Sequence, residues 1–301
     1  MHNITIPENS SSNCYDAVVY SFLKYCGFDH EAYNAKYFYT QYYNPSSDIF
    51  WRICRDNNQS SFLKDVFGVD LVYKAKAENP PETADLWGII IDPYWCRWSP
   101  FYQKTHYSHS VLIVDIDQKN REYICFDVHF DSHGYIRADF DAINDHYEYQ
   151  FTFDFEKATE TKPEAIAEKI KVVLDGHDHD IEKKKTELTE YFALNDRDSL
   201  FPASLETSVP LINLMWIAED KKHFPMALRY IERKTGKTLF SDVYDPLAAS
   251  EKSFLRLRLM LLKYAMTGVL AKDKLESMIT QIYDTDAYIV EKMQNALRGI
   301  M

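Results

Sequence analysis

Residues 106–127 read HYSHSVLIVDIDQKNREYICFD. Two apolar runs, 110–116 and 122–128, flank a polar stretch in which Asn120 tolerates a left-handed backbone, a pattern typical of a β-hairpin. A three-residue loop over 118–120 pairs residue 111 with residue 127. His109 and Asp127 then share one sheet face as diagonal neighbours, about 7–8 Å apart at Cα, and a shift of two residues would place them directly opposite. The stretch predicts an antiparallel sheet that brings a histidine to a carboxylate.

His109 and Asp127 are candidates for catalysis. A carboxylate beside an imidazole fixes the tautomer of the ring, as a base in nucleophilic catalysis requires. His106 is an alternative to His109, and His129 and Asp115 are alternative partners. We favour His109 because the apolar run that directly follows it would anchor the ring. The competing interpretation is a surface histidine at a strand start and an aspartate that faces solvent.

Cys14 is the candidate nucleophile. It follows the polar stretch 9–13, which is rich in helix-capping residues, and it begins an apolar helix that Gly27 ends. A thiol at a helix N-terminus lies among unpaired N–H groups and at the positive end of the helix dipole, and both favour the thiolate. The same N–H groups can stabilise an oxyanion. The alternative is a buried cysteine that packs as a small hydrophobe.

The orientation of Asp127 follows from the strand that carries it. Asp127 shares a strand face with Tyr123 and Cys125, so we expect it to point inward toward the helix that begins at Cys14. The other cysteines are expected to be structural: Cys26, Cys54, Cys96 and Cys125. The stretch GHDHD at 176–180 is interpreted as a solvated turn rather than a metal site. No metal and no cofactor are predicted.

Length and composition indicate two domains. The 301 residues are 46% hydrophobic and 27% charged, as in globular proteins. Residues 1–155 hold 12 basic and 22 acidic side chains, whereas residues 156–301 hold 22 and 24. Strand patterns end with the first half, and helical patterns fill the second. We predict an α+β domain over residues 1–158 and an all-helical domain over 159–301.

Periodicity also gives the expected elements. In the first half, besides the hairpin, we expect helices over 14–26 and 60–66 and strands over 69–74, 86–91 and 147–155. In the second half, helices are expected over 165–174, 181–194, 211–219, 224–235, 250–266 and 272–297.

Charge and hydropathy exclude two classes of partner. A net charge of −12 argues against nucleic acid, whose binding needs a basic face. The longest apolar stretch is shorter than 18 residues, which argues against a membrane span. The first residues show no secretory signal, and five cysteines without paired spacing fit a reducing compartment. We therefore expect a cytoplasmic protein.

Two stretches carry a family resemblance. The order Cys14, His109, Asp127 resembles the papain-like arrangement, and most closely its C39-peptidase-like branch. Residues 13–27, NCYDAVVYSFLKYCG, and residues 88–109, GIIIDPYWCRWSPFYQKTHYSH, resemble the family named for the N-terminal domain of butirosin biosynthesis protein H. The resemblance covers about residues 10–130.

The resemblance implies a fold and a function. It implies a papain-like N-terminal domain with an antiparallel sheet that acts as an acyltransferase or thioesterase of antibiotic and other natural-product biosynthesis. Cys14 would take an acyl or aminoacyl group from a carrier-protein thioester, His109 would act as base, and Asp127 would orient His109. The partners implied are an acyl or peptidyl carrier protein, whose phosphopantetheine arm bears the acyl group, and a small-molecule acceptor. Five further residues are assigned to substrate binding: Asn13, Asp92, Tyr94, Tyr102 and His106.

The sequence departs from the peptidases at one position. Papain-like peptidases place an oxyanion-hole Gln a few residues before the cysteine, whereas Glu8 and Asn9 stand there here, leaving Asn9 or Asn13 as substitutes. This difference disfavours peptide hydrolysis more than thioester chemistry, because a thioester is the easier acyl donor. A cysteine peptidase or amidase acting on a small peptide is the second hypothesis. The third is a non-catalytic module that binds a ligand through the aromatic segment 94–102.

Basic residues of the second half are the expected docking sites for an acidic carrier protein. These are Lys183, Lys184, Lys185, Lys221, Lys222, Arg229, Arg233 and Lys234.

Overall fold

The computed structural model describes residues 13–42, 58–76, 86–127, 134–158, 160–176, 181–194, 197–201 and 208–300. The chain divides into two units. The sheet unit extends to His30 and then from Leu63 to Thr161, and the helical unit comprises Glu31–Phe62 and Lys162 onward. The segment between residues 30 and 67 holds the 3-10 helix η1 (His30–Tyr42) and the helix α3 (Asn58–Phe67). The helical unit thus includes part of the N-terminal half.

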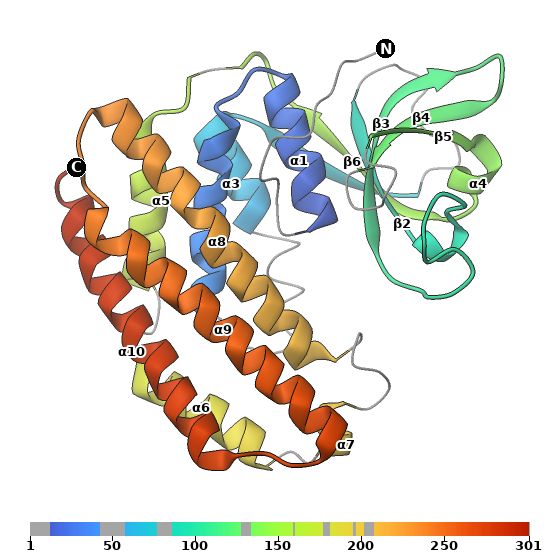
Figure 1. The fold of residues 1–301 in the computed structure, drawn as a ribbon. Helices are drawn as coiled ribbons and strands as arrows, with labels where there is room; N and C mark the ends of the chain where they lie inside the picture. Colours follow the sequence, from blue (N-terminus) through green and yellow to red (C-terminus); the bar gives the residue numbers. More distant parts are fainter. Residues whose placement is uncertain are drawn as a thin grey trace. The chain divides into compact units, whose positions relative to one another are not determined.

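The sheet unit is built on one antiparallel sheet of six strands (Figure 1). The spatial order is β1-β6-β2-β3-β4-β5, and every neighbouring pair is antiparallel. The strands are β1 (Asp70–Ala75), β2 (Trp87–Ile91), β3 (His109–Asp117), β4 (Glu122–Asp127), β5 (Gly134–Asp139) and β6 (Tyr147–Asp154). The prediction of an α+β fold with an antiparallel sheet is confirmed. The edge strand β5 was not predicted.

Helix α1 (Cys14–Tyr25) covers one face of this sheet. Its Phe22 ring stacks on Phe153 of β6 with the ring centroids 3.8 Å apart. On the same face Gly88 lies opposite Phe151, so closely that a Cβ on Gly88 would be 2.0 Å from the ring. The predicted helix is confirmed, and Gly27 follows it in the left-handed region at φ 82°.

The opposite face carries a second apolar core. Its buried members include Trp87, Val111, Tyr123 and Cys125, together with Ile143 of the short helix α4 (Phe140–Asn144). The 3-10 turn η2 (Pro93–Trp95) leads into Cys96, which belongs to the same cluster. The sheet is therefore buried on both sides, which fixes the direction of each strand side chain.

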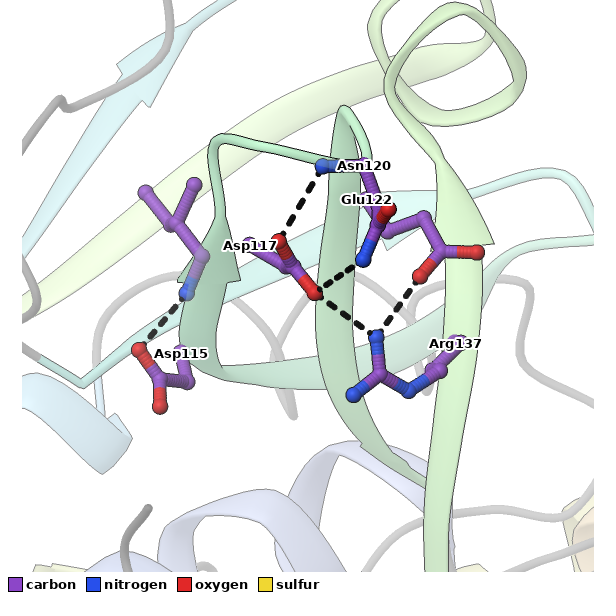
Figure 2. A network of polar contacts seen from close by, with 6 residues as sticks. Asp115, Asp117, Asn120, Glu122 and Arg137 are labelled. Carbon is purple, nitrogen blue, oxygen red and sulfur yellow. Dashed lines mark hydrogen bonds and ion pairs between the residues drawn. The ribbon is translucent and has the colours of Figure 1, made fainter.

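The hairpin between β3 and β4 has a longer turn than predicted. Asp117 pairs with Glu122, which leaves four residues in the loop, and Arg121 rather than Asn120 is left-handed, at φ 55°. The reason is that Asn120 binds both carboxylate oxygens of Asp117, at 3.1 and 2.8 Å. Arg137 of β5 bridges Asp117 and Glu122 at 3.0 and 2.7 Å (Figure 2). These hydrogen bonds, first from Asn120 and then from Arg137, lower the pKa of Asp117 to about 2.

A bulge in β3 corrects the register toward the other end of the hairpin. Ile113 pairs with Cys125 but Asp115 pairs with Ile124, so Val114 is an extra residue on its strand. This extra residue offsets the longer turn. Beyond the bulge Leu112 pairs with Phe126, which places residue 127 across from residue 111, as predicted.

The described residues from Lys162 onward form these further helices: α5 (Pro163–Gly176), α6 (Ile181–Leu194), α7 (Arg197–Leu200), α8 (Val209–Thr235), α9 (Ser241–Thr267) and α10 (Lys272–Leu297). Helices α8, α9 and α10 are long and pack side by side (Figure 1). The expected separate helices over 211–219 and 224–235 are wrong, because α8 continues through Pro225. Burial of flanking residues such as Phe224 and Leu228 holds the helix together there. Among the described helices, none is both long and apolar enough to cross a membrane.

One predicted docking residue lies inside this unit. The Lys221 ammonium donates to Asp286 of α10 at 2.8 Å, and its side chain is 0% exposed. Ser250 of α9 donates to the same carboxylate oxygen at 2.7 Å. Lys221 is therefore a buried contact between helices and not a surface cation, which corrects its assignment to a docking site.

Candidate functional site

The thiol of Cys14 lies at the first turn of α1. Asn13 caps the helix, since its side-chain oxygen accepts from the Asp16 N–H at 2.8 Å. The first bond within the helix joins the Ala17 N–H to the Asn13 carbonyl. The backbone N–H of Cys14 precedes that bond, so the sulfur and this donor lie together at the positive end of the helix.

Two residues of β3 bind the Cys14 sulfur. The Ser110 N–H donates to Sγ at 3.4 Å, and the Ser110 and His109 side chains are also hydrogen-bonded to it. Burial opposes ionisation of the thiol, but the charge of His109 and these hydrogen bonds outweigh it and lower the pKa of Cys14. Ser110 pairs with Ile90 in a register that places it on the sheet face covered by α1, so it meets the helix start directly.

His109 is held between Cys14 and Asp127. Its Nε2 is 2.8 Å from Oδ2 of Asp127, which leaves Nδ1 as the ring nitrogen that faces the sulfur. The two residues are 2% and 1% exposed. Burial lowers the pKa of His109. The Cys14 charge and the hydrogen bonds to Asp127 and Cys14 raise it by a larger amount, so the net shift of the pKa is upward. Such a site favours a thiolate beside an imidazolium.

Trp98 completes the environment of Asp127. Its indole Nε1–H donates to Oδ2 of Asp127 at 3.1 Å, the same oxygen that binds His109. The expectation that Asp127 points inward toward the helix that begins at Cys14 is wrong. Asp127 lies on the face of Tyr123 and Cys125, and α1 covers the opposite face. His109 contacts the thiol at the end of its strand rather than through the sheet, and Asp127 holds the far side of the His109 ring.

A second His–Asp pair lies on the segment that follows β2. Nδ1 of His106 is 2.6 Å from Oδ2 of Asp92, and its ring stacks on Tyr94 with centroids 4.0 Å apart. Asp92 also accepts from the backbone N–H groups of Tyr94 and Tyr107, at 3.0 and 3.4 Å. The His106 side chain is 65% exposed. Three of the residues assigned to substrate binding thus form one cluster, separate from the buried His109–Asp127 pair.

The two remaining residues assigned to substrate binding have other surroundings. Asn13 is the helix cap, and its amide also donates to Asp16 at 2.6 Å. Tyr102 lines an open, polar groove of about 530 Å³ that Trp95, Arg97, Arg121, Asp139 and His146 also line. Asn9, His129, Cys54 and residues 177–180 lie outside the described residues.

Sequence reasoning missed three residues at this site: Ser110, Trp98 and Tyr107. Ser110 is adjacent to His109, and the side chains of adjacent strand residues point to opposite faces, so the strand pattern gives no sign that both contact one atom. Trp98 belongs to the aromatic segment 94–102, which was singled out as a whole, whereas Tyr107 lies between the two candidate histidines and was not singled out. The ring of Tyr107 lies 6.3 Å from the ring of His109.

The other described cysteines differ from Cys14. Burial raises the pKa of Cys26 to about 11. Burial, followed by the charges of Asp127 and Asp92, raises the pKa of Cys96, and burial, followed by the charges of Cys96 and Asp127, raises the pKa of Cys125. Within the described part of the chain, Cys14 is the cysteine whose thiolate the surroundings favour.

The chain was compared with family models and with curated proteins. No family model matches the chain, and no curated protein matches it. Within the described residues, no group of three or more His, Cys, Asp or Glu side chains could hold a metal ion.

Proposed function

We propose that this chain is a cysteine acyltransferase or thioesterase that accepts acyl groups from thioesters, with Cys14 as nucleophile, His109 as acid and base and Asp127 as the residue that orients His109. The observation that carries the proposal is the continuous set of contacts from the Cys14 sulfur through the His109 ring to Oδ2 of Asp127. A nucleophile, a base and an orienting group in that order are the parts of nucleophilic acyl transfer. We further propose that the sheet unit has a papain-like architecture.

In the first step, the Cys14 thiolate attacks the thioester carbonyl carbon and forms a tetrahedral intermediate. The carbon–sulfur bond to the leaving thiol then breaks, and His109 gives its Nδ1 proton to that thiolate. The product is an acyl group on Cys14 and a neutral imidazole. Asp127 holds the ring through Nε2 during both events, so that Nδ1 stays directed at the reacting sulfur.

In the second step, the neutral His109 accepts a proton from an amine, an alcohol or water as that molecule attacks the acyl carbon. The bond to Cys14 breaks, and the sulfur leaves as the thiolate that the imidazolium and the Ser110 donors stabilise. Water as acceptor gives hydrolysis, and an amine or alcohol gives transfer. A thiol is a good leaving group, so a thioester suits a site in which one histidine serves as the acid.

Incubation with the acetyl thioester of N-acetylcysteamine and with an acylated carrier protein tests the proposal. Mass spectrometry of the intact protein and of its Cys14 peptide should show the added acyl group, and Cys14→Ser should abolish the adduct while far-UV circular dichroism stays unchanged. Cleavage of peptides without any acylation by thioesters would favour the peptidase alternative. If the folded protein neither accepts acyl groups nor cleaves peptides, the ligand-binding module is favoured.

A further inference from the structure

The proposed reaction needs a second hydrogen-bond donor near Cys14. Attack on a carbonyl places negative charge on its oxygen, and removal of one positioned donor to that oxygen typically lowers the rate about 10²–10³-fold. The Cys14 backbone N–H at the helix start supplies one donor. Two of the described side chains near the helix start are already used, because Asn13 caps the helix and the Ser110 side chain is hydrogen-bonded to the sulfur itself.

Tyr107 has a hydroxyl that is available for this role. It lies two residues before His109, and its ring packs edge-on against Phe101, with centroids 5.2 Å apart, and beside the His109 ring at 6.3 Å. Its backbone N–H donates to Asp92 at 3.4 Å. The ring is thus held on two sides and by its backbone, yet the residue is 38% exposed. Its hydroxyl makes no hydrogen bond to any residue that the structure describes.

The surroundings of Tyr107 also keep it a donor. Burial and then the negative charges of Cys14, Asp127 and Asp92 raise the pKa of the Tyr107 hydroxyl above its ordinary value. The hydroxyl therefore stays protonated across the range in which the thiolate acts. The Tyr107 ring also lies beside the His109 ring, which is itself hydrogen-bonded to the Cys14 sulfur, and this places the phenol on the side of the thiol.

We infer that the Tyr107 hydroxyl donates a hydrogen bond to the carbonyl oxygen of an acyl group attached at Cys14, as that oxygen becomes negatively charged. The inference rests on the proposed role of Cys14 as an acyl-accepting nucleophile. Tyr107 would take the place of the glutamine that papain-like peptidases carry before the cysteine. It is a catalytic residue on this view, because its hydroxyl touches a reacting atom.

Two reactions of the same thiol separate this role from a structural one. Iodoacetamide alkylates Cys14 by displacement at a CH₂ group, without an oxyanion. p-Nitrophenyl acetate acylates it through a tetrahedral oxyanion, releases p-nitrophenolate and leaves an acetyl thioester on Cys14. Tyr107→Phe should slow acylation about a hundredfold and leave the alkylation rate unchanged. The matched control is Tyr149→Phe, an exposed tyrosine of β6, which should change neither rate.

Other outcomes overturn the inference. Equal acylation rates for Tyr107→Phe and the wild type would show that the hydroxyl donates nothing, and equal slowing of both reactions would show a structural role. Tyr107→Leu tests whether the ring acts only by apolar packing. If Tyr107→Leu loses acylation while Tyr107→Phe keeps the wild-type rate, the hydroxyl is not a donor. If wild-type Cys14 accepts acetyl from the ester but not from the thioester, the proposed function fails, and the comparison of variants on the ester still decides the role of Tyr107.

Discussion

The indole N–H of Trp98 and the carboxylate of Asp127 are joined by a hydrogen bond of 3.1 Å, on the oxygen that also binds His109. Asp127 is buried, and a buried carboxylate is costly unless donors hold it in the ionised form. Trp98 is such a donor. It therefore acts through Asp127 on the imidazole and, through the imidazole, on the thiol.

Trp98→Phe should weaken the thiolate while preserving the packing of the segment. Without the indole donor, the ionised form of the buried Asp127 carboxylate is less stable, so the carboxylate takes the proton of His109 more readily. The imidazolium that stabilises the Cys14 thiolate is then lost. The pH profile of Cys14 alkylation by iodoacetamide should shift to higher pH. A merely structural effect would lower the thermal midpoint without shifting that profile. Trp95→Phe, on the exposed turn η2, is the control and should leave the profile in place.

Much of the fold could be predicted from sequence because the pattern and the burial agree. Alternation in 147–155 gave β6 within one residue, and the helical period gave the bounds of α6 and α10. The edge strand β5 was missed because Ile136 and Ala138 are its only two buried residues, so its apolar alternation is too short to mark a strand. Helix α8 was divided in two because Pro225 and the polar stretch before it resemble a helix end. Yet Lys221 and His223 in that stretch are buried by tertiary packing, which no local pattern reports.

The candidate site could be predicted in part. The pairing of the strands that carry His109 and Asp127 was predicted correctly because two features missing from the prediction, a longer turn and a bulge, cancel each other. The turn is one residue longer than expected, and the Val114 bulge restores the register before it reaches His109 and Asp127. Bulges and turn lengths depend on contacts across strands, such as those of Arg137 with the turn. The contact of Trp98 with Asp127 joins residues 29 positions apart through an irregular segment, so periodicity could not reveal it.

Iodoacetamide should label Cys14 well before the other described cysteines near neutral pH. Its pKa is lowered by the His109 charge and the hydrogen bonds that outweigh burial, whereas burial raises the pKa of Cys26, Cys96 and Cys125. Because the thiolate is the reactive form, lowering the pH from 8 to 6 should slow labelling of Cys14 less than that of an ordinary thiol. Peptide mapping after short exposure measures each site. Uniform, slow labelling would contradict the nucleophile assignment.

His109→Ala should cost about as much activity as Cys14→Ala, because members of one catalytic unit do not contribute additively. His106→Ala should cost clearly less, since His106 is exposed and bound to Asp92 rather than to the Asp127 pair. Steady-state rates on the thioester for the single and double variants measure this. A larger loss for His106→Ala than for His109→Ala would mean that the wrong histidine has been chosen.

Gly88→Ala should destabilise the sheet unit. The added Cβ would lie 2.0 Å from the buried ring of Phe151, so the ring or the strand must move. Overpacking of this kind costs about 1–3 kcal/mol or more. Denaturant unfolding should show it as a lower midpoint. In Gly88→Ala/Phe151→Leu the smaller side chain makes room, so the double variant should be more stable than the sum of the two single effects allows; additive effects would contradict the clash.

The buried pair of Lys221 and Asp286 gives the last prediction. Asp286→Leu leaves the fully buried Lys221 ammonium without its partner at 2.8 Å, and breaking a buried pair in this way costs about 3–5 kcal/mol. Lys221→Met leaves Asp286 with the Ser250 hydroxyl, a weaker partner, and should also destabilise the protein. The double variant Lys221→Met/Asp286→Leu removes both charges, so it should recover most of the loss. Replacing Lys171 in the exposed pair with Asp175 on α5 is the control and should barely change stability. Chemical denaturation of the wild type and of these four variants separates the two possibilities. A double variant as unstable as the worse single variant would show that the helices need this ion pair for their packing. Recovery in the double variant would show that only the unpaired charge is harmful.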